Sequence, residues 1–546
     1  MKVKALFENN ETPTLPEYIK RCGVEIPYKE YVFPIGHVEK PENYDNLYHG
    51  LTILNDMVTY QYNIEDKIVI ICDSDCDGYC SATIAYDFLR KMGVKEHNIE
   101  VLFHTGKQHG FSQDIIDQLQ NKGDALHNVK WIWVPDAGTN DVFASTYYKN
   151  FFDITVLITD HHIATEDNFS AVVINNQTSN KVTNKQLCGA GVTHKLITAY
   201  CNEHGLKHHQ TMLDLVALAT IGDVCDLRVP ENRMIVKWGT EHIHNKFLHA
   251  MCDEFVSDGD ITPHSLAWNI IPKINAVCRD VETPEIHKAL FNAFVDEFFN
   301  DMDFLNKLRE CHSRQRNKAN KLYEDAMKSG YVGDAVKIFI IENTPYTGLV
   351  ASKLADAYNC PCMVVHESNN NHAYMGSLRS PVPLKSKLAE SGLMTICAGH
   401  EASCGVGWMA QDIYKLSDYC NELNLEPEPK QVMYSTDNAL IQPEIFEIAD
   451  AGKEFWGHGV PEPTIYISNV GVNGKFIKEL GSTKTTIKFT YGDIDFIMFF
   501  VNKETKEKMH VGEDVNMTWN IIGVPSINEF RGNERKQVVI SEWEVE

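Results

Sequence analysis

The stretch Lys67-Ile-Val-Ile-Ile-Cys-Asp-Ser-Asp-Cys-Asp-Gly78 decides the fold of this chain. Its apolar run, Ile68 to Cys72, is rich in β-branched residues and is typical of a strand buried on both faces of a parallel sheet. Three carboxylates follow at alternate positions: Asp73, Asp75 and Asp77. The pattern then becomes helical over residues 81–92, so the stretch predicts the start of an α/β unit.

Ligands bind at the carboxyl end of such a strand, and three crowded carboxylates repel one another unless a cation neutralises them. The stretch therefore predicts a metal site. One alternative is an EF-hand, whose loop also begins D-x-D-x-D-G but needs a preceding helix and a Glu at position 12. Position 12 is Ile84, and a strand precedes the motif. The other alternative, a solvated acidic turn, can be decided only by the rest of the chain.

Composition limits the class of protein. The chain has 546 residues, 43% hydrophobic and 23% charged, which predicts a soluble globular protein of two to four domains. No apolar run reaches membrane-spanning length, and no signal-peptide pattern opens the chain, so we expect a cytoplasmic protein without membrane association. Fifteen cysteines without a framework spacing favour reduced thiols. The net charge of −25 means that any nucleic-acid site must find its positive charge locally.

Further predicted strands also end in acids or imidazoles. We expect these strands at Asn98–Phe103, Lys130–Val134, Ile154–Thr159 and Ala171–Ile174. Asp136 follows the second of them, and Asp160-His161-His162 follows the third. Because the carboxyl ends of parallel strands lie on one edge of a sheet, these side chains should converge with the first acidic motif.

A buried helix predicted over Met212–Leu227 adds two more acids. A buried carboxylate is costly unless it is paired or bound to a metal. Asp223 is the better candidate for a ligand. Asp226 lies nearer the break in the helix, where a cap or an ion-pair partner is expected.

These motifs resemble the DHH phosphoesterase superfamily and, within it, the RecJ-like single-strand-specific exonucleases. The resemblance covers about residues 45 to 546. It is carried by Asp73–Gly78, Asp136-Ala-Gly138, Asp160-His161-His162, Cys188-Gly-Ala-Gly191, Leu213–Asp223 and Pro272–Arg279. It extends to Ala398-Gly-His-Glu-Ala-Ser-Cys-Gly405, where the family pattern has Gly for Ala398 and a second Ala for Cys404.

The resemblance implies a two-metal phosphodiesterase with two divalent ions, Mn²⁺ or Mg²⁺. The implied metal ligands are Asp73, Asp75, Asp77, Asp136, His161 and Asp223, with Asp136 bridging the ions. His162 and Asp160 are implied as catalytic groups that polarise the phosphate, although they and Asp73 could also be ligands or hold the ligands in place. The implied substrate-binding residues are Arg279, Ser377, Arg379, Ser380, Gly399 and His400. Gly106-Lys107 lies where relatives have a further arginine.

The predicted fold class is α/β: a parallel-sheet DHH domain and a second, DHH-associated α/β domain joined by a long helix, with a C-terminal OB-like barrel. The expected divisions are 1–66, an irregular lead-in; 67–283, the DHH catalytic domain; 284–330, the connecting helix; 331–410, the DHH-associated domain; 411–463, a linker with helices; and 464–546, the OB-like domain. The cations of the connecting helix could face the substrate or form only a solvated charged face.

The resemblance implies an exonuclease that hydrolyses single-stranded DNA, 5′→3′, with single-strand-binding or replication and recombination proteins as possible partners. One alternative is a DHH-type phosphodiesterase for short oligonucleotides or cyclic dinucleotides, which would not need the C-terminal barrel. Another is a non-catalytic relative that binds DNA or a replication partner. Loss of metal ligands would mark that class, and every acidic motif is intact here.

Overall fold

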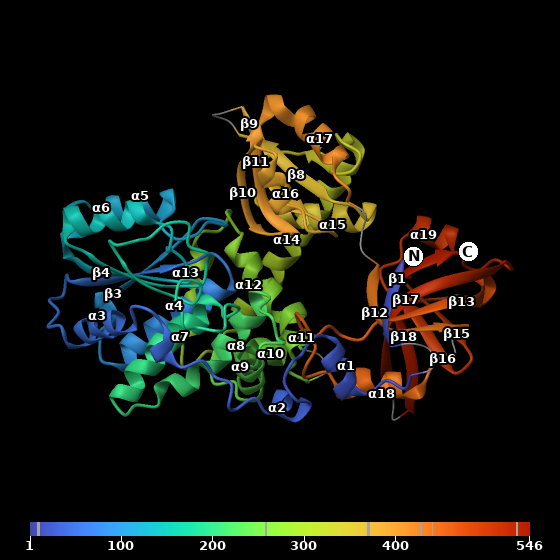
Figure 1. Cartoon of the computed structure of the whole chain (residues 1–546), viewed down its shortest axis with the longest axis horizontal. Helices are drawn as coiled ribbons and strands as arrows, with labels where there is room; N and C mark the ends of the chain where they lie inside the picture. Colours follow the sequence, from blue (N-terminus) through green and yellow to red (C-terminus); the bar gives the residue numbers. More distant parts are fainter. Residues whose placement is uncertain (8–10, 257–258, 369–371, 426–428, 439–440, 531–532) are drawn as a thin grey trace.

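The computed structural model describes residues 1–7, 11–256, 259–368, 372–425, 429–438, 441–530 and 533–546. Its strands form three sheets, which lie in three lobes of the molecule: the first at the left of Figure 1, the second at the top and the third at the right. None of the described helices is both long enough and apolar enough to cross a membrane. All fifteen cysteines are free.

The first sheet is wholly parallel, with the strand order β3-β2-β4-β5-β6. Its strands are β2 (Lys67–Cys72), β3 (Ile99–Phe103), β4 (Val129–Pro135), β5 (Thr155–Asp160) and β6 (Val172–Asn175). The chain runs from β2 to β3 on one side and then returns to place β4 on the other side. The point where the strand order reverses therefore lies between the carboxyl ends of β2 and β4, which is where open α/β sheets bind their ligands.

Helices cover both faces of this sheet. Alternate residues of β2 enter different cores: Ile68 and Ile70 pack with the helices of one face, and Val69 and Ile71 with those of the other. The first face carries α3 (Leu47–Thr59), α4 (Cys76–Lys91), α7 (Gly189–Glu203) and α8 (Leu213–Gly222). The second carries α5 (Gln113–Gln120) and α6 (Val142–Phe152). Burial on both faces explains why the strands are continuous apolar runs.

A helical region extends this lobe toward the second one. It comprises α9 (Pro230–Glu241), α10 (Lys246–Phe255), α11 (Pro263–Ser265), a π-helical turn (Leu266–Ile270), α12 (Ile271–Cys278), α13 (Glu285–Val295) and α14 (Met302–Ser329). The prediction of one connecting helix over 284–330 is wrong, because the chain breaks between α13 and α14. Asp301 caps α14 by accepting a hydrogen bond from the Phe304 backbone N–H at 3.0 Å.

The second lobe contains a mixed sheet with the order β10-β11-β9-β8-β7. Its strands are β7 (Lys337–Ile340), β8 (Cys362–Glu367), β9 (Ala373–Arg379), β10 (Met394–His400) and β11 (Ser403–Met409). Only β7 and β8 pair in parallel. The helices of this lobe are α15 (Thr347–Tyr358), α16 (Lys385–Glu390) and α17 (Ile413–Glu422).

The third sheet draws on both ends of the chain. Its order is β1-β12-β13-β17-β18-β16-β15-β14. These strands are β1 (Val3–Phe7), β12 (Lys430–Asp437), β13 (Ile465–Asn473), β14 (Lys478–Leu480), β15 (Thr486–Tyr491), β16 (Ile494–Met498), β17 (Asn516–Phe530) and β18 (Asn533–Val545). Accompanying helices are α1 (Leu15–Arg21), α2 (Tyr28–Val32), α18 (Pro443–Ala451) and α19 (Lys503–Lys508).

This sheet corrects two expectations. The start of the chain is not irregular, because β1 pairs in parallel with β12, and the region expected to be a linker supplies β12 itself. A buried arginine also joins this lobe to the first one. Arg233 donates to the Glu454 backbone oxygen at 3.0 Å and to its carboxylate at 2.5 Å, and its guanidinium lies 4.5 Å from the Phe455 ring centre. The Arg233 side chain is buried and that of Glu454 is half-exposed, so loss of Glu454 would leave a buried charge without its partner and weaken this contact between the lobes.

Candidate metal centre

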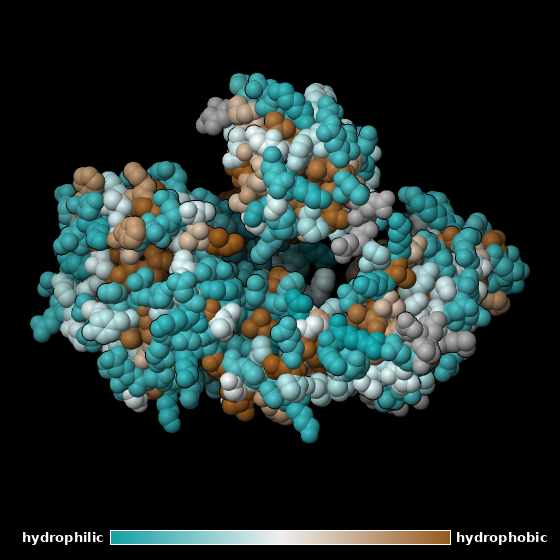
Figure 2. Space-filling view, viewed as in Figure 1, coloured by the Kyte–Doolittle hydropathy of each residue, from teal (hydrophilic) through white to brown (hydrophobic). Residues whose placement is uncertain are grey.

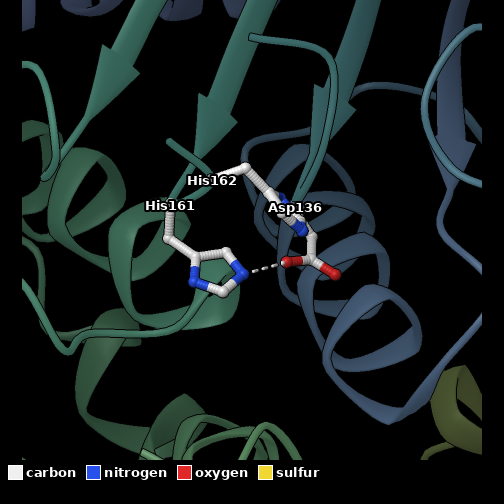
Figure 3. Close-up of side chains that lie close together, drawn as sticks. All are labelled: Asp136, His161 and His162. Atoms are coloured by element: carbon white, nitrogen blue, oxygen red, sulfur yellow. Dashed lines mark ion pairs between the residues drawn. The ribbon is translucent and has the colours of Figure 1, made fainter. Parts of the chain in front are cut away.

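The acids and histidines predicted at the strand ends meet at the carboxyl edge of the first sheet. Asp136 follows β4, and His161 and His162 follow β5, so that their side chains face each other across the sheet edge (Figure 3). Asp73 and Asp75 come from the turn between β2 and α4, and Asp77 lies in the first turn of α4. The convergence predicted from the strand ends is thus confirmed.

Asp136 occupies an unusual backbone conformation at the centre of the cluster. Its φ is +78°, which residues other than glycine adopt rarely, and Asn and Asp most readily among them. Its N–H donates to the Thr159 carbonyl at 2.7 Å, which ties the turn after β4 to β5. Its Oδ1 lies 3.3 Å from His161 Nε2 without hydrogen-bond geometry, and this buried oxygen has no hydrogen-bond partner. A buried carboxylate oxygen without a hydrogen-bond partner is available to bind a metal ion.

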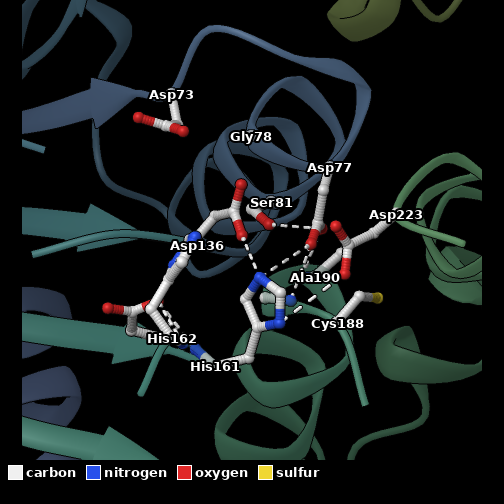
Figure 4. A network of polar contacts seen from close by, with 12 residues as sticks. Asp73, Asp77, Gly78, Ser81, Asp136, His161, His162, Cys188, Ala190 and Asp223 are labelled. Atoms are coloured by element: carbon white, nitrogen blue, oxygen red, sulfur yellow. Dashed lines mark hydrogen bonds and ion pairs between the residues drawn. The ribbon is translucent and has the colours of Figure 1, made fainter. Parts of the chain in front are cut away.

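The His161 ring lies among three carboxylates (Figure 4). Its Nε2 is 3.3 Å from Asp136 Oδ1 and 3.9 Å from Asp77 Oδ2, and its Nδ1 is 3.6 Å from Asp223 Oδ2. Asp223 stands just past the C-terminus of α8, as the sequence predicted. Asp226 instead pairs with Arg228 at 2.6 Å, so its expected role as an ion-pair partner is confirmed.

Backbone N–H groups at the start of α7 hold Asp77. Gly189 N donates to its Oδ2 at 2.7 Å and Ala190 N to its Oδ1 at 2.8 Å, and the Ser81 hydroxyl adds a bond at 3.2 Å. The N-terminus of a helix stabilises negative charge through its free N–H groups and its dipole. These hydrogen bonds fix the position of the Asp77 carboxylate.

Asp73 and Asp75 are held by a different set of groups. His109 Nδ1 donates to Asp73 Oδ2 at 2.5 Å, and Gly110 N donates to Asp73 Oδ1 at 3.1 Å. Asp75 caps α4 by accepting from Gly78 N at 3.1 Å. A side chain at Gly78 would lie 2.5 Å from the Asp73 carbonyl oxygen, so only glycine permits this tight turn.

Asp160 holds the His-His pair rather than pointing into the cluster. Its Oδ1 accepts from the backbone N–H of both histidines, at 2.7 and 3.1 Å, and from His162 Nδ1 at 2.8 Å, while its Oδ2 accepts from Thr139 N at 3.0 Å. Burial favours the neutral acid, but the bond from His162 outweighs it, so the pKa of Asp160 lies well below its usual range. Burial likewise disfavours the charge on His162, yet the bond to Asp160 raises the pKa of His162 to about 9.

The remaining carboxylates repel one another, which indicates that the cluster needs a cation. Burial, together with the charges of Asp77, Asp75 and Asp73, raises the pKa of Asp136 well above its usual range. Burial raises the pKa of Asp223 to about 6, although His161 opposes the rise. A divalent cation would remove this penalty, and the mixed oxygen and imidazole donors fit such an ion.

Three overlapping groups of side chains could hold metal ions. In each, one ligand atom per residue lies within 4.8 Å of the others. The groups are Asp136 with His161 and His162, Asp73 with Asp75 and His109, and Asp77 with His161 and Asp223. The set contains more donors than one octahedral ion needs once it keeps its waters, so the cluster has room for two ions.

A cluster of cations lies beside the acids. The loop that carries Lys107 is tied to the acidic turn, because Gln108 N donates to the Ser74 hydroxyl at 2.7 Å. Burial and the neighbouring Arg279 lower the pKa of Lys107, and the same two causes lower the pKa of Arg379. The charges of these three cations therefore affect one another, although Lys107 and Arg279 belong to the first lobe and Arg379 to the second. Among the described residues, no carboxylate forms an ion pair with any of them.

The other predicted substrate-binding residues lie in the second lobe, and their contacts and exposure differ. Ser377 bonds Thr347 through their hydroxyls at 2.9 Å, and the Ser380 hydroxyl donates to the Val382 carbonyl at 2.6 Å within a turn. The loop at the end of β10 needs glycine only at Gly399, whose φ is +122°. The His400 side chain is exposed, and partial desolvation and the charge of Lys385 lower its pKa, with smaller effects from His161 and His458.

Sequence reasoning missed His109 and His458. His109 lies in a loop after β3 and not directly at a strand end, so the strand-end rule does not select it. Only its position two residues after Lys107 could have drawn attention to it. His458 belongs to the turn that enters the third lobe. Its carbonyl accepts from Leu227 N at 2.9 Å, which places this turn directly behind Asp223 and Asp226.

Several known proteins resemble the chain. Residues 67–220 match the family described as "DHH family, N-terminal domain", and residues 439–542 match the "RecJ OB domain". A Bacillus subtilis protein named as a putative SPbeta prophage-derived single-strand DNA-specific exonuclease, YorK, is 27% identical over 97% of this chain and 96% of its own length. The single-stranded-DNA-specific exonuclease RecJ of the same organism is 25% identical over 100% of this chain and 70% of its own length.

Solved structures agree on the fold. The crystal structure of Thermus thermophilus RecJ in complex with Mn²⁺ superposes with a TM-score of 0.73 at 16% identity, covering 100% of this chain and 78% of that one. The family matches lie on the lobes that carry the first and third sheets, and the metal-binding groups lie within the first. Residues 67–220 therefore carry the N-terminal domain of the DHH family and residues 439–542 the RecJ OB domain, and the chain as a whole resembles the RecJ exonucleases.

Proposed function

We propose that this protein is a metal-dependent exonuclease that hydrolyses the phosphodiester bonds of single-stranded DNA from the 5′ end. The observation that carries the proposal is the cluster of carboxylates and imidazoles at the sheet edge, with cations from two lobes beside it. The relatives named for single-strand-specific exonuclease activity support the substrate class.

Mn²⁺ or Mg²⁺ would be held by Asp73, Asp75, Asp77, Asp136, His161 and Asp223, with His109 as an added candidate. Asp136 is the best candidate for a shared ligand because its charge interacts with those of Asp77, Asp75 and Asp73. When bound, a pair of divalent ions activates water for in-line attack and stabilises the leaving oxygen.

The protein supplies orientation and charge. Asp160 fixes the His162 ring and keeps it protonated near neutral pH, so the imidazolium can donate a hydrogen bond to a phosphate oxygen. Asp160 itself has both oxygens occupied and acts through His162. Lys107, Arg279 and Arg379 would bind the terminal 5′-phosphate, because unpaired cations close together favour a dianion between them.

The phosphate role predicts a change in end preference. Arg379→Ala should lower kcat/KM on 5′-phosphorylated single strands by about 10- to 100-fold, the range for one charge-assisted hydrogen bond. Activity on 5′-hydroxyl strands should change little. Arg379→Lys keeps the charge and should retain part of the preference. Initial rates on matched oligonucleotides with and without the phosphate test this, and equal rates on both ends in wild type and variant would contradict it.

The third lobe offers an exposed surface for a longer strand. Among the aromatic residues of this lobe, Phe489 and Phe496 stack in the core with ring centres 5.0 Å apart. Phe476 is 68% exposed and Phe500 is 85% exposed. Lys475 and Lys478 flank Phe476, and stacking combined with positive charge is how OB surfaces bind single strands.

Substituting lysines on this surface tests its role in binding DNA better than removing the end of the chain does. Removing residues 464–546 would leave β12 without β13, its partner in the sheet. Lys475→Gln with Lys478→Gln should weaken binding to long single strands and reduce the slope of log affinity against log salt by about one to two. Lys503→Gln with Lys508→Gln is the matched control, because these lysines pair with glutamates within α19. If the salt slope is unchanged, these lysines do not contact DNA, and the surface has a structural or partner-docking role instead.

One assay tests the proposed activity as a whole. Purified protein with Mn²⁺ or Mg²⁺ is given single strands labelled at either end, duplex DNA, dinucleotides and cyclic dinucleotides. Stepwise release of nucleotides from the 5′ end of single strands is expected. Hydrolysis of dinucleotides alone would instead indicate a small-substrate phosphodiesterase, and binding without hydrolysis would indicate a non-catalytic relative.

A further inference from the structure

We propose that Trp268 stacks on a base of the bound single strand, several nucleotides on the 3′ side of the cleavage site. This inference rests on the proposed function and extends it to a second contact with the strand. Trp268 lies in the π-helical turn Leu266–Ile270 and is 69% exposed. Large aromatic side chains are usually more buried than this in a soluble protein.

Trp268 belongs to the same continuous helical segment as two residues at the metal centre. Asn275 and Arg279 follow it by seven and eleven residues, across the π-helical turn and α12. The Asn275 side chain accepts from Cys76 N at 3.1 Å, at the start of α4 beside Asp75. Arg279 belongs to the proposed phosphate pocket. The helical segment that reaches the metal centre at the end of α12 therefore begins near Trp268.

The other end of this helical segment reaches the third lobe. His264 lies beside Trp268, with ring centres 6.0 Å apart. A side chain at Gly457 would contact Pro263 at 4.0 Å, so the turn into the third lobe packs against α11. Figure 2 shows the surface hollowed between the three lobes, and α11 and α12 lie in this central region in Figure 1. The helical segment that carries Trp268 thus contacts the turn into the third lobe at one end and the metal centre at the other.

Positive charge gathers next to Trp268 although the chain as a whole is acidic. The Lys273 ammonium donates to the carbonyl of Asn269, the residue after Trp268. Burial and Arg309 lower the pKa of Lys273, and burial, Lys273 and Arg316 lower the pKa of His312, so these groups lie close together where α12 meets α14. Arg309 pairs with Glu254, but among the described residues Lys273 and Arg316 have no carboxylate partner. An exposed aromatic ring and unpaired cations on the same helical segment match a nucleotide, with its base and its phosphate.

The π-helical turn has a structural cause of its own. Pro272 has no N–H to donate to the Trp268 carbonyl, and Ile271 N donates instead to the Leu266 carbonyl, five residues back. The turn alone would not indicate a binding site. The observation that matters is that the Trp268 side chain remains exposed, although Leu266 and Ile270 of the same turn are buried.

The spacing fixes which nucleotide is involved. Eleven residues of helix separate Trp268 from Arg279, a rise of roughly 16 Å. A stacked strand rises about 3.4 Å per nucleotide, so the contact falls about three to five nucleotides from the 5′ end. A trinucleotide would not reach Trp268, whereas a dodecamer would.

Binding and cleavage of 5′-phosphorylated strands of 3 and 12 nucleotides test the proposal with the full-length protein and Mn²⁺. Trp268→Ala should weaken binding of the dodecamer about tenfold, the scale of one lost stacking contact, and leave cleavage of the trinucleotide unchanged. Trp268→Phe should restore most of the affinity. Trp238→Ala is the matched control, because Trp238 is 46% exposed and stacks on His242 within α9.

An abasic scan identifies the contact itself. One abasic nucleotide is placed at each of positions 2 to 8 of the dodecamer. Wild type should lose affinity at a position between about three and five, and Trp268→Ala should show no further loss there. Equal affinity of wild type and Trp268→Ala, or the same loss in Trp238→Ala, would overturn the stacking role while wild-type cleavage of single strands still upheld the proposed function. If wild type neither binds nor cleaves single strands, both fail.

Discussion

Asp136→Asn is expected to abolish hydrolysis and to lower kcat by about a thousandfold or more. Losses of this size follow when a group that stabilises charge in the transition state is removed. Asparagine has the same shape as aspartate and tolerates the φ of +78° at this position, whereas alanine would add backbone strain. The change therefore removes the charge and keeps the fold. His161→Ala should be similarly inactive, because the His161 ring contacts Asp77, Asp136 and Asp223. EDTA should stop the wild-type reaction.

The same variant should be more stable than wild type without metal. The Asp136 carboxylate is buried among other carboxylates, and one of its oxygens has no hydrogen-bond partner, so its charge destabilises the metal-free protein. Thermal denaturation in EDTA should give a higher Tm for Asp136→Asn than for wild type. Added Mn²⁺ should raise the Tm of wild type by mass action and that of the variant much less.

Asp124→Asn is the control for this pair of measurements, because Asp124 is exposed and lies in the segment before β4, at the opposite edge of the sheet. It should leave the activity and the response to Mn²⁺ unchanged. Activity of Asp136→Asn near the wild-type value in metal-replete buffer would contradict the proposed metal centre. A lower Tm in EDTA would show that the carboxylate has a structural partner instead.

Much of the metal centre could be predicted from sequence because it obeys one topological rule. Parallel strands end on one edge, so acids just after β2, β4 and β5 had to meet. Asp223 was predictable for another reason, since an acid at the end of an apolar helix needs a partner. These arguments use only local pattern and the direction of the strands.

The parts of the fold and of the metal centre that the sequence did not predict depend mainly on contacts that a local sequence pattern does not reveal. β1 and β12 pair across more than 420 residues of chain, and a four- or five-residue apolar segment carries no information about a partner so distant. The break after α13 left a local signal, the capping aspartate Asp301, but its effect was outweighed by the lack of glycine and proline in the segment. His109 became visible only when its loop was placed against Asp73.

The role of one motif also could not be predicted from sequence. The motif Cys188-Gly-Ala-Gly191 resembles the family pattern, but the sequence alone did not indicate what it does. The structure supplies a role for Gly189. A Cβ at Gly189 would lie 2.2 Å from Asp136 Oδ1 and 2.6 Å from Asp136 Cα, closer than real Cβ contacts. The backbone N–H of Gly189 also holds Asp77 Oδ2 at 2.7 Å. The absence of a side chain here lets α7 approach both acids at once.

Gly189→Ala is therefore expected to displace Asp136, Asp77 or both, and to weaken Mn²⁺ binding about 10- to 100-fold, as loss of support for metal ligands does. Activity at limiting metal should fall by at least the same factor. Isothermal titration with Mn²⁺ measures the affinity directly, and excess Mn²⁺ should restore part of the activity if the ligands are only shifted.

Gly191→Ala separates this effect from general damage to α7. Its Cβ would lie 2.5 Å from the Leu187 side chain, a flexible apolar group, and not against a metal ligand. It should lower the Tm through overpacking while keeping the affinity for Mn²⁺ near that of wild type. If both variants lose the same affinity, the effect comes from the helix as a whole. If Gly189→Ala binds Mn²⁺ like wild type, then Asp136 and Asp77 do not hold the metal in the arrangement described.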